Sequence, residues 1–365
     1  MKLPLLSLLL LFALAVSIFL LPQKSFSEAE NRALQTWKTP TVRSLTNGEF
    51  TARLHDFYTD QLPLRPLWIR GKATIERLLG KQENNGILFG KNGYLIPKNE
   101  YQSLTVAKQN LAAIEAFQAS TDAPLTVLLV PRSIDVMASK LPTLYDDTHA
   151  KAVLSLIDTS TCVFPLEELR QAAEDASQVW FKTDHHWTAD GAYLAYLALA
   201  DSLGYTPYPL SFFEREAVSQ SFLGTSCSKA GGLADEADPL VLYRFENDAQ
   251  WILEKKETGE TQSGFYDWSA LEKKDQYQVF LGGNTGLLTV RAPLVSKPRL
   301  LLIKDSFSGA LVPFLALHFD IDLIDPRYHQ GSVQAQAQTG IYDHILIEQG
   351  IDTLATDPSL SRALS

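Results

Sequence analysis

The segment from Asp184 to Trp187 carries the side chains best suited to acid–base chemistry. It sets two of the 7 histidines of the chain beside a carboxylate, just before an expected helix over 188–203. A serine nucleophile needs an imidazole base, and that base needs an acceptor for its other nitrogen. An Asp-x-His spacing supplies both groups if the segment is turned. Because neighbouring side chains point in different directions, we expect only one of the two histidines to face a site.

The same residues also fit two other roles. Thr188 or Asp184 could cap the start of the helix, with a histidine packed against Trp187. Asp and His also bind zinc or manganese, and a DHH run occurs in metal-dependent phosphoesterases. Those enzymes need companion clusters, whereas the three later histidines are scattered singly, at His318, His329 and His344. We therefore expect neither a metal nor a cofactor.

Ser306 is the second candidate, in the segment LLLIKDSFSGALVPFLALHF. An apolar strand ends just before Asp305 and a helical pattern begins just after Ser306. The hydroxyl is therefore expected at the carboxyl edge of a parallel sheet, where open α/β sheets bind their ligands. N–H groups at the helix start could stabilise an oxyanion there. Alternatively, Ser306 or Asp305 caps the helix. The sequence around Ser306 has no GxSxG elbow, so an α/β-hydrolase is not supported.

Three further side chains could contact a substrate. Asn284 ends the segment FLGGN and could donate to an oxyanion, although the segment also suits a plain turn. Arg327, in DPRYH, follows the next expected strand at the same sheet edge, where a substrate anion or a sugar would be met. It could equally be a surface charge. Phe307, next to Ser306, is a third candidate contact.

Strands and helices are expected to alternate around these residues, which predicts a parallel sheet with helices on both faces. The expected strands are 125–130, 299–303, 321–324 and 344–347, and the expected helices are 106–119, 148–158, 165–177, 188–203, 307–319 and 333–338. Between the two blocks, 205–297 has short aromatic segments and Gly pairs, and we expect an irregular β-containing insertion. The segment 87–97 predicts a β-hairpin that turns at Asn92-Gly93.

The N-terminal residues 1–27 contain an almost unbroken apolar run from Leu3 to Leu21, which as a helix would span roughly 28 Å, about one bilayer core. We expect a signal anchor; the alternative is a signal peptide, whose apolar part is usually only about 7–15 residues long. Either one exports the rest, giving a single-pass membrane protein with an extracytoplasmic domain, or a secreted protein. Behind it, 28–86 predicts a helical stalk interrupted by Pro63 and Pro66, and 87–365 the main domain.

The composition of the 365 residues excludes several classes of protein. With 45% hydrophobic and 20% charged residues, most of the chain can bury a core. The net charge of -10 and the lack of a basic block argue against nucleic acid. Two cysteines, Cys162 and Cys227, are too few for a Cys-rich zinc site. Outside the cytosol they would be free to form one disulfide.

Several motifs together resemble a known family. They are SEAENR, DQLPLR, KTDHHWT, FLGGN, KDSFSG and DPRYH. This set is similar to the DHHW protein family of Gram-positive bacteria, itself similar to the alginate O-acetylation proteins of the SGNH hydrolase-like superfamily. The resemblance extends over nearly the whole chain. In the alginate group Asp-x-His-Trp precedes the serine, a circular permutation of the usual SGNH order, and this chain has that order.

The resemblance implies a circularly permuted SGNH-like α/β fold with Ser306 as nucleophile, His186 as base and Asp184 as the residue that orients it. It also implies Arg327 near the site and Asn284 as an oxyanion donor.

Two departures leave the composition of the oxyanion hole open. Position 304 is Lys where the nucleophile block usually has Gly. The GxND block is absent, and Glu348 or Gln349 stands on the strand where it is expected.

The activity that the resemblance implies is serine-dependent O-acetyl transfer, or acetyl-ester hydrolysis, on a cell-envelope polysaccharide through an acyl-serine. A membrane protein that donates acyl groups would be the partner for transfer. Transferase and esterase differ in acceptor binding and water exclusion, which the sequence does not separate. The alternative is an inactive polysaccharide-binding or assembly protein of the cell envelope.

Overall fold

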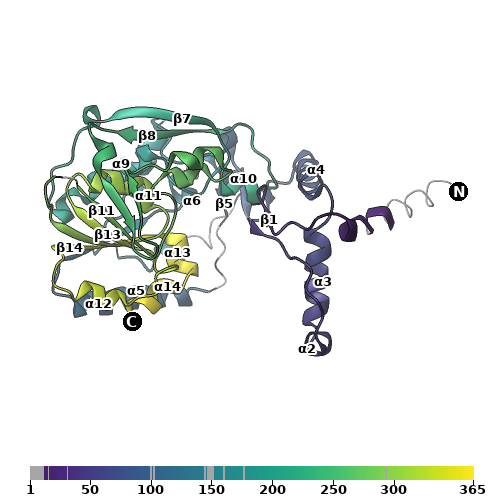
Figure 1. Ribbon diagram of the computed structural model, residues 1–365. Helices are drawn as coiled ribbons and strands as arrows, with labels where there is room; N and C mark the ends of the chain where they lie inside the picture. Colours follow the sequence, from purple (N-terminus) through teal and green to yellow (C-terminus); the bar gives the residue numbers. More distant parts are fainter. Residues whose placement is uncertain are drawn as a thin grey trace.

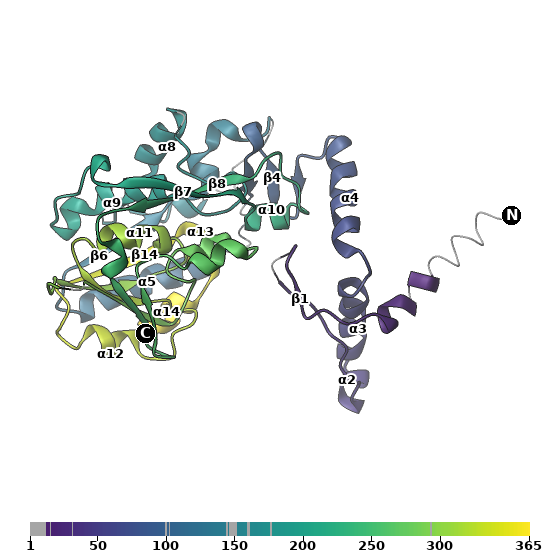
Figure 2. The same ribbon diagram turned by 45° about the horizontal axis from the view of Figure 1, so that its top comes forward.

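The computed structural model describes residues 12–365, apart from 15, 31, 99, 100, 102, 144, 146–151, 159, 160, 176 and 293. It consists of a layered α/β body and an arm that carries the N-terminal part of the chain on one side (Figure 1). Figure 2 shows the same separation after a 45° turn, with α3 and α4 standing apart from the sheet.

A seven-stranded mixed sheet forms the centre of the body. Its strands, in spatial order, are β10 (Glu260–Ser263), β9 (Ile252–Lys255), β11 (Leu287–Arg291), β13 (Asp320–Ile324), β12 (Arg299–Ile303), β14 (His344–Gly350) and β6 (Leu125–Val130). The last four run parallel to one another, which confirms the parallel core that the sequence predicts. The other three add to it antiparallel.

Helices cover both faces of this sheet, and β12 shows why its sequence is continuously apolar. Leu300 and Leu302 join the core under α9 (Ala189–Leu203) and α11 (Ser308–Leu315). Leu301 and Ile303 point the other way, into the core with the second helical layer. That layer contains α5 (Thr105–Ser120), α12 (Val333–Ala337), α13 (Ile351–Thr356) and α14 (Ser359–Leu364) (Figure 1).

The segment 205–297 belongs largely to the sheet and to the surroundings of the site. Its strands β9, β10 and β11 extend the main sheet, so that sheet is mixed and not purely parallel. A separate pair, β7 (Glu214–Phe222) and β8 (Asp238–Arg244), is antiparallel and encloses α10 (Thr225–Lys229) in the sequence. The chain thereby brings α10 beside the loop that precedes α9, as the hydrogen bond from Cys227 N to Thr183 O shows.

The expected helices occur with some changes at their ends. The helix expected over 307–319 is observed as α11, which stops at Leu315. The helix expected over 165–177 is α8 (Leu166–Glu174). The helix expected over 148–158 falls partly on residues outside the described part of the chain. A short helix, α6 (Ser133–Val136), follows β6 and was not expected.

The arm contains α2 (Val42–Thr46), α3 (Glu49–Asp60) and α4 (Arg65–Leu78). Pro66 does not interrupt α4, because it lies in the first turn, where a missing N–H leaves no helical bond unmade. The predicted hairpin is confirmed: β4 (Ile87–Phe89) pairs antiparallel with β5 (Leu95–Pro97), and β3 (Glu83–Asn84) adds a third strand. Asn92 and Gly93 take positive φ values of 56° and 79° in its turn.

The expected signal anchor lies mostly outside the described residues, which begin at Phe12. Among the described residues, no helix combines the length and the apolar character that crossing a bilayer requires. The two cysteines are free thiols, with Cys162 beside the core of the second helical layer and Cys227 in a small cluster near β4.

Two motifs that lie far apart in the sequence meet in the arm. Glu30 accepts hydrogen bonds from Arg65 at 2.7 and 3.0 Å. Arg32 donates to Asp60 at 3.1 Å, and the Gln35 N–H donates to the same carboxylate at 2.8 Å. Burial opposes the ionised form of Asp60, but these bonds outweigh it and hold its pKa below the ordinary value. The segments SEAENR and DQLPLR therefore fasten the start of the arm to α3 and α4.

Asp60→Ala should loosen the arm without affecting the sheet. The change leaves the Gln35 N–H without its acceptor and removes one of the two carboxylates that Arg32 binds, Glu30 being the other. We expect the free energy of local unfolding of the arm to fall by about 2 kcal/mol. Hydrogen exchange should accelerate in α3 and not in β12. The control is Glu49→Ala, which removes an exposed ion pair with Arg53 and should cost under about 0.5 kcal/mol. Equal exchange in the two variants would contradict this account of the arm.

Candidate active site

A cavity of about 510 Å³ opens at the carboxyl edge of the parallel strands. Its lining includes the loop before α9 with Asp184, the loop after β12 with Ser306, Thr225, and the segment from Asp275 to Asn284. Arg327, in the loop after β13, lines it as well. The topology therefore brings together residues that are more than a hundred positions apart in the sequence.

Asp184, His186 and Ser306 form a continuous hydrogen-bonded chain. Nδ1 of His186 lies 2.6 Å from Oδ1 of Asp184, and Nε2 lies 2.7 Å from Oγ of Ser306. An ionised carboxylate only accepts hydrogen bonds, so Nδ1 carries the proton and Nε2 is the acceptor for the serine hydroxyl. This is the orientation that a base needs in order to take a proton from Ser306.

The carboxylate of Asp184 is buried and fully engaged. Oδ1 accepts from the backbone N–H of His186 at 3.0 Å. Oδ2 accepts from Thr225 twice, at 2.6 Å from the backbone N–H and at 3.0 Å from the hydroxyl. Burial favours the neutral acid, but the two neighbouring histidines and the Thr225 N–H outweigh it and hold the pKa of Asp184 far below its ordinary value. Asp184 is therefore ionised at neutral pH.

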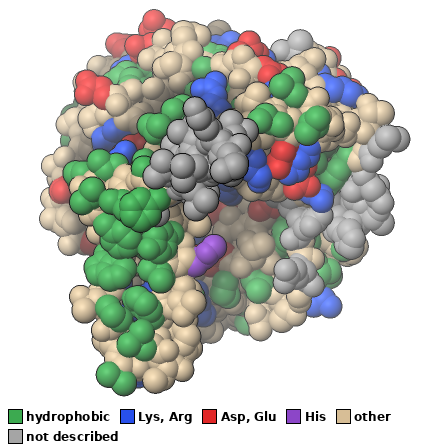
Figure 3. All heavy atoms as spheres, turned by 90° about the vertical axis from the view of Figure 1, so that its right-hand side faces the viewer, with side chains coloured by type: hydrophobic (Ala, Val, Ile, Leu, Met, Phe, Trp, Pro, Cys, Tyr) green, Lys and Arg blue, Asp and Glu red, His purple; other side chains and the backbone are tan. Residues whose placement is uncertain are grey.

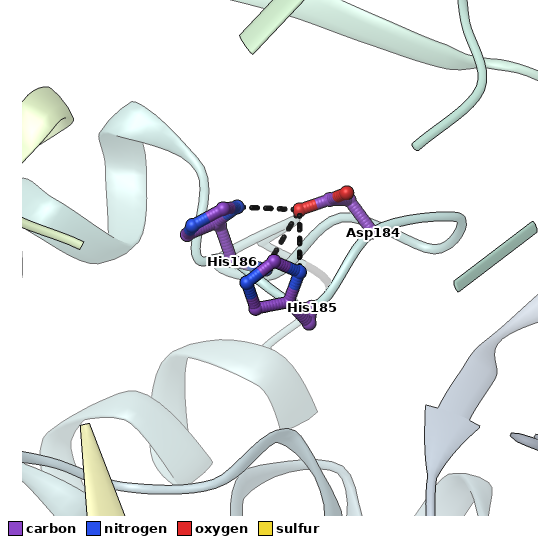
Figure 4. A group of neighbouring side chains, drawn as sticks. All are labelled: Asp184, His185 and His186. Carbon is purple, nitrogen blue, oxygen red and sulfur yellow. Dashed lines mark hydrogen bonds and ion pairs between the residues drawn. The ribbon is translucent and has the colours of Figure 1, made fainter. Parts of the chain in front are cut away.

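His185 also faces Asp184, so the expectation that one histidine points away is wrong. Figure 4 shows both imidazoles directed at the same carboxylate, with His185 Nδ1 3.4 Å from Asp184 Oδ1. The same nitrogen lies 2.6 Å from the hydroxyl of Thr225. Because that hydroxyl donates to Asp184, it accepts from His185. The tight turn between the two histidines brings their ring centroids to 3.8 Å.

The other residues of the DHHWT segment hold it in place. Trp187 is buried and donates from its indole nitrogen to the backbone oxygen of Phe307 at 3.0 Å, which ties this loop to the Ser306 loop. Thr188 is the N-cap of α9, accepting from the Gly191 N–H. Of the two capping candidates, Thr188 therefore caps the helix and Asp184 does not.

Tyr277 fixes the plane of the His186 ring. The two rings stack with centroids 3.9 Å apart and an interplanar angle of 4°, and Phe307 packs edge-on against the imidazole at 5.0 Å. The ring is thus held between aromatic side chains while its two nitrogens are aligned with Asp184 and Ser306.

Asp305 shapes the turn that presents Ser306. Its Oδ1 accepts from the Phe307 N–H at 3.0 Å and its Oδ2 from the Gly350 N–H at 2.8 Å. The helix α11 begins at Ser308 and has no side-chain cap, so Ser306 is not a capping residue. Its hydroxyl is directed to His186 instead.

Glu348 lies beneath this turn and is completely buried. It accepts from the Asp305 N–H at 3.3 Å and from the hydroxyl of Ser308. Burial, together with the adjacent charge of Asp305, raises the pKa of Glu348 well above its ordinary value. A neutral Glu348 therefore supports the serine turn without adding a second negative charge.

The substrate-contact candidates differ in position. Asn284 lines the cavity, and its side-chain oxygen accepts from Lys304 Nζ at 2.6 Å. Arg327 also lines it, in a two-point ion pair with Asp325 at 2.9 and 2.7 Å. Phe307 does not line the cavity; it packs in the core, and its N–H is already bonded to Asp305. It is therefore unsuited to hold an oxyanion.

Thr225 and Tyr277 are the site residues that the sequence analysis missed. Both lie in the segment 205–297, which the sequence marks only as irregular. Thr225 is 41 positions beyond Asp184, and a lone Thr after a Gly has no pattern that would signal its contact with a carboxylate. Only the path of the chain through β7 and α10 brings it there.

One group of side chains could hold a cation. Asp184, His185 and His186 offer ligand atoms within 4.8 Å of one another, and they form the only such group among the described residues. A metal on His186 would have to displace either Asp184 or Ser306, since both ring nitrogens are already used. The donor set therefore fits a hydrogen-bonded relay better than a metal centre.

Gly224→Ala should disrupt the Asp184–His186 contact. The backbone at Gly224 has φ −82° and ψ −165°, which any residue adopts, but a Cβ there would lie 2.2 Å from Oδ2 of Asp184. We expect a loss of about 1–3 kcal/mol of stability and loss of the downfield proton NMR signal of the His186 Nδ1–H. Gly71→Ala is the control, since nothing lies within 4 Å of its Cβ. Retention of the signal in Gly224→Ala would contradict the packing described.

The part of the chain that matches a known protein family contains Asp184, His186 and Ser306. The family model described as "DHHW protein" matches residues 127–324, more than half of the chain. A probable alginate O-acetylase AlgJ of Pseudomonas fluorescens is 24% identical over 206 residues, which cover 52% of each protein. The AlgJ protein of Pseudomonas syringae is 26% identical over 180 residues, 45% of each. The chain spans about half the length of these curated relatives.

Solved structures show the same fold at low identity. A DHHW family protein of Eubacterium siraeum superposes with a TM-score of 0.62 at 19% identity, covering 76% of this chain and 95% of that one. Bacillus cereus PatB1 with a sulfonyl adduct gives 0.61 at 20% identity, covering 76% and 97%. These likenesses confirm the predicted SGNH-like α/β fold. With the match of the family model, they show that the chain belongs to the DHHW protein family.

Proposed function

We propose that this protein is a serine-dependent enzyme that transfers or removes an O-acetyl group on a polysaccharide. The observation that carries the proposal is the hydrogen-bonded chain Asp184–His186–Ser306 at the mouth of a cavity. Relatives named alginate O-acetylase support the reaction class and a polysaccharide substrate, at low identity over half their length.

The first half of the reaction forms an acyl-serine. His186 Nε2 takes the proton of Ser306 as Oγ attacks the ester carbonyl, and the C=O electrons move to the oxygen. When the carbonyl re-forms, the ester C–O bond breaks and the leaving alcohol takes the proton from Nε2. Asp184 stays ionised throughout and stabilises the imidazolium through Nδ1.

The second half releases the acyl group. Water or a sugar hydroxyl gives its proton to His186 and attacks the acyl carbonyl, and Ser306 leaves with that proton. Attack by water yields acetate, and attack by a sugar yields an acetylated polysaccharide. Choice between them depends on which nucleophile occupies the cavity.

In this mechanism two donors stabilise the oxyanion. The first is the backbone N–H of Ser306, the nucleophile itself. It has no hydrogen-bond partner among the described residues. The amide of Asn284 is the second: its oxygen accepts from Lys304, and its NH₂ group has no hydrogen-bond partner in the part of the chain that the structure describes. Lys304, the departure from the usual Gly, thus orients a donor.

The location of the protein, its substrate and its partner are proposals as well. We place the protein outside the cytosol, held by its N-terminal apolar run, with a cell-envelope polysaccharide as substrate. A membrane protein that supplies acyl groups would make transfer the physiological direction.

Ser306→Ala should abolish activity. Acetyl-ester hydrolysis by the full chain should fall by at least about 10³-fold, and a fluorophosphonate probe should label the wild type at Ser306 only. The matched control is Ser221→Ala, an exposed serine on β7, which should leave the rate unchanged. Activity that survives Ser306→Ala would overturn the mechanism, and loss of activity on chelation would favour a metal. No turnover of any acetyl ester would favour a binding or assembly role.

Thr225 should act as a positioning residue for Asp184. Thr225→Val removes the hydroxyl but keeps the backbone N–H, so we expect kcat to fall about 10-fold, the effect of one hydrogen bond to a charged group. Thr225→Ser should restore the rate. A merely structural role would instead lower stability and leave kcat per folded molecule unchanged.

A further inference from the structure

The helix α4 and its two flanking residues expose large apolar side chains on one side, in one group at the start of the helix and one at its end. The exposed residues are Leu64, Leu67, Trp68, Ile75, Leu78 and Leu79, each between 54% and 82% accessible. Their spacing of three, four and seven positions puts them on one side of the helix. Large apolar side chains at this spacing normally face a core. Here the same pattern faces outward.

The opposite side of α4 is fixed to the protein. Ala73 is 2% exposed and packs so close to Gly231 that a Cβ at that glycine would lie 2.9 Å from the Ala73 methyl. Arg77 donates to both oxygens of Asp235, at 2.9 and 3.3 Å. The helix therefore cannot turn its apolar side inward without losing these contacts.

Positive charge flanks the apolar face. Arg70 and Lys72 are both exposed, and they lie to either side of the stripe at a helical rotation of 100° per residue. Lys72 also lies 3.5 Å from Glu76, the single acidic residue of α4. A basic helix with Trp and Leu on one side is typical of segments that lie in a lipid interface.

The N-terminal apolar run ends on the same arm. Phe19, near its end, packs against Phe57 of α3 at 5.8 Å and Tyr58 at 5.7 Å. Beyond it, the Lys24 N–H donates to the side chain of Gln61 at 3.0 Å, just after α3. Gln61 lies three residues before Leu64, so the chain that follows the run is fastened close to the start of α4. Figure 3 looks onto this side of the molecule, where apolar side chains cover much of the projecting arm.

We infer that α4 docks through its apolar face on an anionic lipid surface. Leu and Trp side chains enter the interface between headgroups and acyl chains, and Arg70 and Lys72 meet the lipid phosphates. The inference does not rest on the proposed chemistry.

Site-directed labelling of the full chain tests this inference. In a background of Cys162→Ser and Cys227→Ala, an environment-sensitive fluorophore is placed by Ile75→Cys or Leu78→Cys. The control is Gln118→Cys, an exposed position of α5 on the body. The protein is reconstituted into vesicles of equimolar phosphatidylcholine and phosphatidylglycerol, with and without spin-labelled lipid.

We expect blue-shifted emission and strong quenching by spin-labelled lipid at positions 75 and 78, and neither at 118. Arg70→Gln with Lys72→Gln, or vesicles of phosphatidylcholine alone, should reduce both effects. Water-like emission at 75 and 78, or no association of the chain with the vesicles, would overturn the inference. Blue-shifted emission that rises with protein concentration without lipid would identify a contact between copies instead. Each of these outcomes is independent of ester hydrolysis.

Discussion

Asp184 is only 2% exposed and carries a negative charge. A buried carboxylate is stable only when hydrogen-bond donors match the lone pairs of its oxygens. Its donors come from two segments, the histidine loop itself and the start of α10 at Thr225. The imidazole of His186, oriented by this carboxylate, in turn contacts the hydroxyl of Ser306 at the sheet edge. The position of α10, the course of the histidine loop and the orientation of the imidazole all follow from the need to solvate this carboxylate.

A second acidic group, beneath the site, has the opposite protonation state. Glu348 is buried beside Asp305 and favours its neutral form, whereas Asp184 favours its ionised form. The difference lies in the neighbouring groups: both carboxyls accept hydrogen bonds, but Asp184 has two imidazoles beside it, whereas Glu348 has the negative charge of Asp305. One environment supplies a fixed charge to the histidine, and the other supplies a neutral support for the turn that carries Ser306.

The body and the arm are stabilised by different forces. The body depends on a sheet whose strand β12 is buried on both faces, with aliphatic side chains alternating between two helical layers. The arm has a small aromatic core around Phe57, fastened by the ion pairs of Glu30 and Asp60. The arm therefore has a core of its own, although many of its apolar side chains are exposed.

The sequence by itself determined the parallel core, the hairpin at 87–97 and the identity of the residues at the sheet edge. It could do so because strand and helix periodicity and turn chemistry are local, and because a strand-to-helix junction always lies at the carboxyl edge. It left open whether Ser306 and Asp184 are capping residues, and it was wrong about His185. Tertiary structure decided these points, since a hydrogen bond between positions 186 and 306, or between 184 and 225, depends on how distant loops are packed together. The same holds for α4: the sequence predicts a helical stalk there, but only the packing of Ala73 and Arg77 decides that its large apolar side chains point outward.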